Sequence, residues 1–142
     1  MASVDHLERF TPMAPRLAAL MDVSRDEARL ALHVLAKPKE MREVVGRPGM
    51  RASPLASGSR RPTTKGRLVC LEPGASLPLH RHLGEETVLV FQGAFIDDGG
   101  RVVRAGEEVV SPAGSAHAVP RILGDEPCLC AIINDIGLEI LP

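Results

Sequence analysis

The sequence predicts a mainly β protein, an antiparallel sandwich or small barrel that follows a short N-terminal helical segment. Two observations predict this fold class. From about residue 66, short apolar runs recur about every 8–12 residues, and Gly- and Pro-containing turns separate them. The first 46 residues instead carry signals that begin and end helices. A chain of 142 residues, 44% of them hydrophobic, is long enough to form one domain with a sizeable core.

Two helices are predicted in the first part of the chain. Thr11 precedes a proline and can cap a helix over Met13–Met21. Ser24 and Glu27 have the spacing of a capping box, in which each side chain binds the backbone N–H of the other residue. This box predicts a second helix that runs to Ala36.

Pro38 can begin a third short helix through Val45, and the Gly- and Pro-containing stretch 46–49 ends the helical part. We therefore expect a helical segment over residues 1–47 and a β domain over residues 48–142. Residues 51–65 are rich in Ser, Pro, Gly and Arg, and this composition fits a loop, or a strand followed by a loop.

Five runs of the C-terminal part have strand character, and Asp97–Gly100 has the composition of a hairpin turn. No repeat at solenoid spacing is present, so one barrel or sandwich accounts for the pattern. The runs are Arg67–Leu71, Thr87–Phe91, Arg101–Val103, Glu108–Val110 and Pro127–Asn134.

Charge is unevenly distributed along the chain. Residues 1–65 contain 12 Lys and Arg against 7 Asp and Glu, whereas residues 66–142 contain 5 against 11. A basic stretch can contact nucleic acid, but this excess is modest, and the chain has no Trp or Tyr to stack on bases. We therefore expect no nucleic-acid partner.

The sequence also favours a cytoplasmic protein without membrane contact. No apolar run approaches the ~20 residues of a membrane span, and the first residues lack the layout of a secretory signal. The three cysteines are an odd number, and an extended strand would hold the Cα atoms of Cys128 and Cys130 too far apart for a relaxed disulfide. We expect these two thiols to pack as small buried apolar groups.

Four residues have the donor types and spacing of one metal site: His80, His82, Glu86 and His117. Residues i and i+2 of a strand face the same side, so the first two imidazoles can converge while Arg81 points away. Glu86 would come from the next strand, and His117 from a strand well downstream. Neutral imidazole and carboxylate both bind borderline divalent metals such as Zn, Fe, Mn, Ni and Cu. We expect one divalent metal ion here.

Glu85 and His33 also carry donor atoms of these types. Glu85 neighbours Glu86 and could compete with it, although strand alternation points only one of the two inward. His33 lies among apolar residues of a predicted helix and fits a core or interface histidine better than a ligand. His6 is assigned no role.

The ligands lie within two strings that resemble the motifs of the cupin superfamily. Its first motif, Gly-x5-His-x-His-x3-Glu-x6-Gly, is matched from Gly74 to Gly93. Its second motif, Gly-x5-Pro-x-Gly-x2-His-x3-Asn, is matched from Gly106 to His117, with Arg121 in place of the final Asn. The position that departs is not a metal ligand in the family, so the resemblance still implies metal binding.

The resemblance implies a cupin double-stranded β-helix, that is, a jelly-roll barrel. It also favours Glu86 over Glu85. The metal ligands that it implies are His80, His82, Glu86 and His117.

Within the cupins, the stretch 78–100 is similar to the cupin domain of ChrR-type anti-sigma factors, and the similarity extends over residues 66–135. In that family a zinc-binding helical domain binds a sigma factor, and the metal-bound cupin half is needed for release under oxidative stress. The zinc domain uses a His-x3-Cys-x2-Cys motif, whereas this chain has no Cys before Cys70. The resemblance therefore implies the sensing half without the familiar sigma-binding half.

Two functions remain open at this point. In the first, the protein is regulatory: the metal-loaded barrel binds a small-molecule ligand or senses a reactive species, and the helices meet a protein partner such as a sigma factor. In the second, it is an Fe(II)-dependent dioxygenase of a small organic substrate, since three His and one Glu leave two octahedral positions open. Zn or Fe is the expected metal.

No catalytic residue is assigned, because Glu85, Asp97 and Asp98 are general-base candidates by type only. Cupin barrels often pair, and an edge strand together with an apolar helix face predicts a homodimer.

Overall fold

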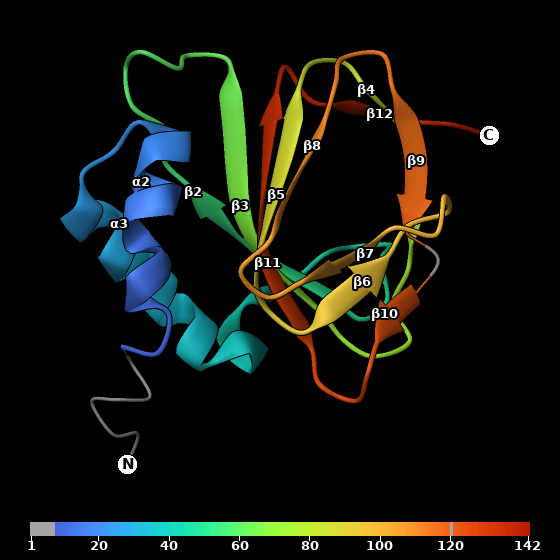
Figure 1. Cartoon of the computed structure of the whole chain (residues 1–142), viewed down its shortest axis with the longest axis horizontal. Coiled ribbons are helices and arrows are strands. Elements are labelled where there is room, and N and C mark those ends of the chain that lie inside the picture. Colours follow the sequence, from blue (N-terminus) through green and yellow to red (C-terminus); the bar gives the residue numbers. More distant parts are fainter. Residues whose placement is uncertain (1–7, 120) are drawn as a thin grey trace.

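The structure is a computed structural model that describes residues 8–119 and 121–142. Within them, helices at the N-terminal end precede three antiparallel sheets that form a barrel (Figure 1). The predicted mainly β fold with an N-terminal helical segment is therefore confirmed. Residues 1–7 of that segment, including His6, lie outside the described residues.

The largest sheet has six strands in the order β1-β2-β3-β11-β5-β8. All its neighbouring strands are antiparallel. Its strands are β1 (Arg42–Glu43), β2 (Met50–Leu55), β3 (Thr64–Leu71), β5 (Glu86–Gln92), β8 (Glu108–Ser111) and β11 (Cys128–Asp135).

Two three-stranded antiparallel sheets complete the barrel. The first has the order β12-β4-β9 and contains β4 (Leu77–His82), β9 (Ala116–Val119) and β12 (Leu138–Ile140). The second has the order β10-β6-β7 and contains β6 (Ala94–Ile96), β7 (Val102–Arg104) and β10 (Arg121–Leu123).

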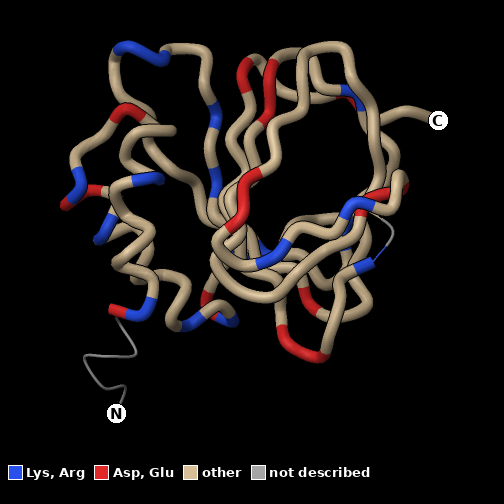
Figure 2. Tube along the Cα trace, viewed as in Figure 1, with Lys and Arg blue, Asp and Glu red and all other residues tan. Residues whose placement is uncertain are grey.

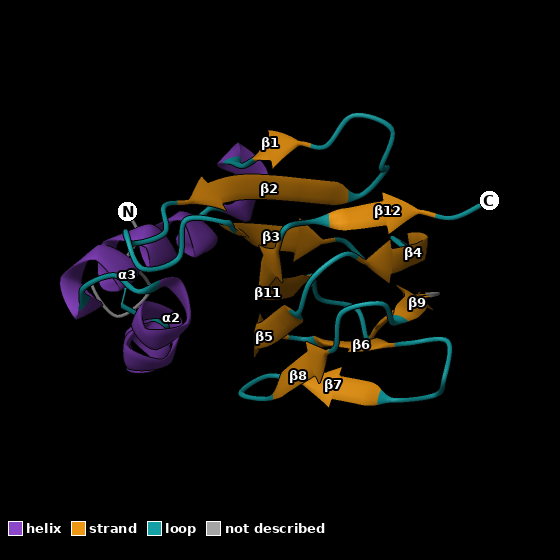
Figure 3. Ribbon diagram, turned by 90° about the horizontal axis from the view of Figure 1, so that it is seen from above, coloured by secondary structure: helices purple, strands orange, loops and turns teal. Residues whose placement is uncertain are grey.

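The centre of the six-stranded sheet is buried on both faces, which explains the apolar runs 88–91 of β5 and 128–133 of β11. Successive side chains of a strand point to opposite faces. Leu89 and Leu129 therefore pack in the core that includes the helices, whereas Val90 and Ile132 pack in the interior of the barrel. Figure 3 shows the helices on one side of this sheet and β4 and β9 on the other.

Helices α2 (Ala14–Met21) and α3 (Arg25–Leu32) cover the outer face of the large sheet. The capping box predicted at the start of α3 is present: the Glu27 N–H donates to Ser24 Oγ at 3.0 Å, and the Ser24 N–H donates to Glu27 Oε1 at 3.3 Å. A short 3-10 helix, Thr11–Met13, precedes α2, and two others, His33–Ala36 and Pro38–Glu40, follow α3.

Charges of both signs are interspersed along the helices, and no long stretch of one sign follows them (Figure 2). Arg29 of α3, for example, lies 3.5 Å from Glu8 and 3.8 Å from Asp26. Arg16 of α2 reaches β8, where it contacts Glu108 at 2.9 Å. Among the helices that the structure describes, none has the length and apolar character of a membrane span.

The prediction of a third helix from Pro38 to Val45 was wrong. A single 3-10 turn follows Pro38, and the chain then extends as β1, which pairs with β2. The pairing satisfies backbone groups in a hairpin, where the Val44 N–H donates to the Met50 carbonyl at 3.0 Å, and Met41 becomes buried. The boundary between the helical segment and the β domain, expected between residues 47 and 48, stays a prediction. Strand β1, which pairs with β2 of the large sheet, lies before this boundary.

Two tight corners connect strands of the barrel. Gly93 has a φ of +75°, and a Cβ there would lie 2.9 Å from the Pro127 carbonyl oxygen, so glycine is required. In the turn between β6 and β7, the Asp97 carboxylate accepts hydrogen bonds from the N–H groups of Gly99 and Arg101, each at 2.9 Å. The predicted hairpin turn is confirmed.

Removing the Leu17 side chain should destabilise the protein, because this residue of α2 is 1% exposed and lies between the helices and the sheet. Leu17→Ala is expected to lower the free energy of unfolding by about 2–5 kcal/mol, measured by urea denaturation. Leu30→Ala is the matched control, since Leu30 of α3 is 59% exposed. Equal losses in the two variants would contradict the packing of Leu17 between the helices and the sheet.

Candidate metal centre

Two paired strands carry the three histidines. On β4, His80 and His82 are 4% and 1% exposed, whereas Arg81 between them is exposed, as strand alternation predicts. On β9, His117 is the direct register partner of His80. The pairing continues past the strand ends, where the His82 N–H donates to the Ser115 carbonyl at 2.8 Å. The backbone of one sheet therefore sets the spacing of all three imidazoles.

The carboxylate comes from a different sheet. Glu86 is the first residue of β5 and is 3% exposed, while Glu85 before it is exposed. Glu86 is therefore the inward carboxylate of the pair, and its role as a metal ligand stays a prediction. Since β4 and β5 belong to separate sheets, the cluster bridges two walls of the barrel.

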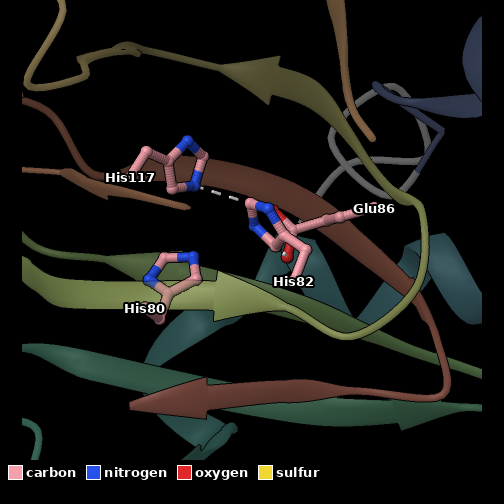
Figure 4. Close-up of side chains that lie close together, drawn as sticks. All are labelled: His80, His82, Glu86 and His117. Carbon is pink, nitrogen blue, oxygen red and sulfur yellow. Dashed lines mark ion pairs between the residues drawn. The ribbon is translucent and has the colours of Figure 1, made fainter. Parts of the chain in front are cut away.

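The four side chains converge on one point (Figure 4). One potential ligand atom from each lies within 4.8 Å of those of the other three. The ring centroids of the histidines are 4.7 to 4.9 Å apart, and the rings are nearly perpendicular, at 82° to 84°. Two ligands that each lie ~2.1 Å from a metal are at most ~4.2 Å apart, so small inward movements bring this cluster to coordination distance.

Hydrogen bonds orient two of the imidazoles. His80 Nδ1 lies 2.8 Å from the Pro78 carbonyl oxygen, which can only accept, so Nδ1 carries the proton. His82 Nδ1 lies 3.1 Å from Ser115 Oγ, whose own hydroxyl donates to the Pro112 carbonyl. In both rings the lone pair is therefore on Nε2, and a metal ligand held in this way has its orientation fixed by its second nitrogen.

The arrangement around His82 fits a cation. Its Nε2 atom is buried without a hydrogen bond and lies 3.3 Å from Glu86 Oε2. His117 Nε2 lies 4.0 Å from Glu86 Oε1. An imidazole lone pair and a carboxylate oxygen repel each other unless a proton or a cation lies between them. The donors present, three imidazoles and one carboxylate, are those that a borderline divalent metal binds. The cluster can therefore hold a metal ion.

Burial determines the protonation of the cluster. Burial, followed by the neighbouring His117 and His80, lowers the pKa of His82 to about 4. Burial, followed by His80, also lowers the pKa of His117. Both imidazoles are then neutral near pH 7, which is the form that binds metal. Burial raises the pKa of the Glu86 carboxyl to about 7, against the opposing effect of Arg67.

A cavity of about 330 Å³ opens beside the cluster. His80, Glu86 and His117 form part of its wall, and most of the remaining wall is apolar. Cys130 also lines it, and a hydrogen bond with Cys128, followed by burial, holds the pKa of its thiol well above the usual value. Cys128 and Cys130 are both free and buried, as predicted.

Some residues of the site were not found from the sequence. Ser115, which holds His82, lies two positions before His117 and could have been singled out by that spacing. Arg67 and Arg47 line the cavity, but which strands enclose it depends on pairings distant in sequence. His33 lies 3.3 Å from Glu8 and is not part of the cluster. Arg121, which replaces the motif's Asn, is exposed on β10.

The barrel and its cluster together define this protein as a cupin. The chain belongs to the family of ChrR cupin-like domains, whose model matches residues 32–134. A chain in the crystal structure of Rhodobacter sphaeroides SigE in complex with the anti-sigma ChrR is 28% identical, with a TM-score of 0.56. The match covers 68% of this chain and 48% of that one, so this chain spans about half the length of that relative.

Other solved structures share the fold at lower identity. A cupin-like protein from Thermotoga maritima is 21% identical, with a TM-score of 0.59, over 72% of this chain and 84% of that one. The polyketide cyclase RemF from Streptomyces resistomycificus is 18% identical, with a TM-score of 0.58, over 74% of this chain and 82% of that one. At these identities the likeness shows the fold alone. No curated protein is significantly similar in sequence.

Replacing His82 should remove the metal. His82→Ala deletes the most deeply buried imidazole of the cluster, and the variant is expected to retain little of the metal found in the wild type. The measurement is elemental analysis of protein purified without added chelator. Glu85→Ala, which removes an exposed neighbouring carboxylate, should keep its metal. Stoichiometric metal in His82→Ala would contradict the assignment of the cluster.

Metal affinity should rise with pH and level off above about 7. In the metal-free protein Glu86 holds its proton with a pKa of about 7, so below that pH the metal must displace a proton. Apparent affinity should then fall by up to about tenfold per pH unit. Zinc titration at about pH 6 and about pH 8 measures the slope. Glu86→Gln has no such proton and should give a shallower slope; equal slopes in the two proteins would exclude Glu86 as its source.

Proposed function

We propose that this chain is a regulatory cupin, in which a metal ion at His80, His82, Glu86 and His117 binds a small molecule or senses a reactive species. The observation that carries the proposal is the position of the cluster, three of whose four residues, His80, Glu86 and His117, line an apolar cavity of about 330 Å³. This volume is at the lower end of the ~300–1,000 Å³ typical of small-molecule sites. A species that enters the cavity therefore meets the metal directly.

Zinc or iron is the metal that we propose, with Mn, Ni or Cu as alternatives. Three neutral imidazoles and one carboxylate form an N/O donor set, and the cluster has no thiolate. Such a set suits borderline divalent ions and does not select among them. Four protein ligands leave two positions open on an octahedral ion, so a ligand can bind without displacing the protein.

The protein partner that we propose is a sigma factor, bound through the helical side of the molecule. The 28% identity to a chain of the SigE–ChrR complex supports this partner. Leu30 of α3 is 59% exposed there and offers an apolar contact among the charged residues of the helix. A homodimer is a second proposed assembly, since β1 and β8 form the edges of the large sheet in the described residues.

An Fe(II)-dependent dioxygenase is the second candidate, and the same cavity beside the cluster favours it. The described residues of the wall include no general base that is free of the cluster, which favours sensing over acid–base catalysis. Glu85, Asp97 and Asp98 do not line the cavity. Dioxygen chemistry at iron does not need such a base, so the metal decides between the two functions.

Elemental analysis of the natively purified protein, followed by oxygen-consumption assays, separates the two functions. Zinc without turnover of diketones, thiols or phenols, together with binding to a sigma factor encoded beside the gene, is the expected result. Glu85→Ala serves as a metal-retaining control and His82→Ala as the metal-free control. Iron with substrate-dependent oxygen uptake would overturn the regulatory proposal in favour of the dioxygenase.

A further inference from the structure

Two arginines line the cavity beside the metal cluster. Arg67 of β3 is half-buried, and its side chain forms no hydrogen bond or ion pair with the residues that the structure describes. Arg47, in the loop between β1 and β2, is also half-buried and donates only to the neighbouring Gly46 carbonyl, at 3.0 Å, within the same residues. A guanidinium has five N–H donors, so most of the donors of both side chains are unused.

Sheet register places Arg67 on the cavity face, close to the cluster. Arg67 pairs with Ile132 of β11, which in turn pairs with Val88 of β5, two residues after Glu86. All these side chains line the cavity. Burial raises the pKa of the Glu86 carboxyl, and the positive charge of Arg67 opposes that rise, so the two groups are within electrostatic range.

The charges around the cavity are unbalanced. Glu86 is the one acidic side chain among the described residues that line it, and its carboxylate faces the histidine cluster. Once a divalent ion is bound there, the cavity carries that ion and two guanidiniums but, among its described residues, a single carboxylate. Uncompensated positive charge in a partly apolar enclosure is costly, and an incoming anion reduces this cost.

We propose that the cavity binds a small organic carboxylate, whose anionic group lies between Arg67 and the metal ion and whose apolar body fills the rest of the space. This inference rests on the metal site proposed above. A guanidinium pairs with a carboxylate through two parallel hydrogen bonds, which explains an arginine rather than a lysine at this position. Arg47 adds a second positive charge at the wall. The apolar body contacts Met50, Leu71, Val88, Phe95, Val119 and Ile132.

Isothermal titration of the zinc-loaded full chain with matched probes tests the proposal. The probes are 3-phenylpropanoate and its neutral isostere 3-phenylpropanamide, with acetate as a carboxylate that lacks the apolar body. The wild type should bind 3-phenylpropanoate at least about tenfold more tightly than either of the other two. Equal binding of the carboxylate and the amide, or no binding of the carboxylate, would overturn the proposal.

Variants of Arg67 test whether this residue causes the preference for the carboxylate over the amide. Arg67→Gln should weaken 3-phenylpropanoate roughly 10- to 100-fold and leave the amide little changed, and Arg67→Lys should lie between Arg67→Gln and the wild type. Arg104→Gln is the matched control, since Arg104 is exposed on β7 and does not line the cavity; it should bind both probes like the wild type. A carboxylate preference that survives in Arg67→Gln would also overturn the proposal.

The zinc content of each protein distinguishes this inference from the proposed function. If the wild type takes up no zinc, the proposed function fails, and the present inference fails with it. If the wild type holds zinc but shows no carboxylate preference, only the present inference fails. If Arg67→Gln itself loses zinc, Arg67 supports the metal cluster rather than the ligand, which contradicts its assignment here.

Discussion

The alternation of side chains along the central strands is the constraint on which the rest of this structure depends. Strands β5 and β11 are buried on both faces, so each residue must suit either the helix-covered side or the interior of the barrel. A shift of one residue in register would exchange the two sets of side chains. The same alternation turns His80 and His82 inward and Arg81 outward. The alternation of side chains along the strands therefore determines both the packing of the core and the position of the histidines.

The interior holds the polar cluster because its hydrogen bonds are largely arranged before any ligand arrives. The Pro78 carbonyl and the Ser115 hydroxyl accept hydrogen bonds from the Nδ1–H groups of His80 and His82, so each ring keeps a single unused nitrogen, Nε2. A buried polar atom without a partner is costly. A divalent ion bound there would satisfy these lone pairs and the Glu86 carboxylate together, so burial of the unpaired atoms would favour metal binding.

The sequence predicted those parts of the molecule that depend on local spacing. The four cluster residues, the capping box at Ser24 and the hairpin turn at Asp97 each follow from a short motif whose geometry the backbone enforces. The prediction of a third helix was wrong because the sequence near Pro38 does not show that β1 is stabilised by pairing with β2. Arg67 was missed for a related reason, since the wall of the cavity comes from strands that are distant in sequence.

Strand β11 contributes side chains both to the core beneath the helices and to the wall of the cavity. Leu129 and Ala131 lie in the core beneath the helices, Cys130 and Ile132 line the cavity, and the register with β5 shifts between Leu129 and Cys130. Because neighbouring residues of one strand alternate between the two sides, a displacement of its backbone moves both. If a molecule held on the helices displaces β11, its binding is coupled to that of a molecule in the barrel. Each then changes the affinity of the other by the same factor, because a coupling free energy is reciprocal.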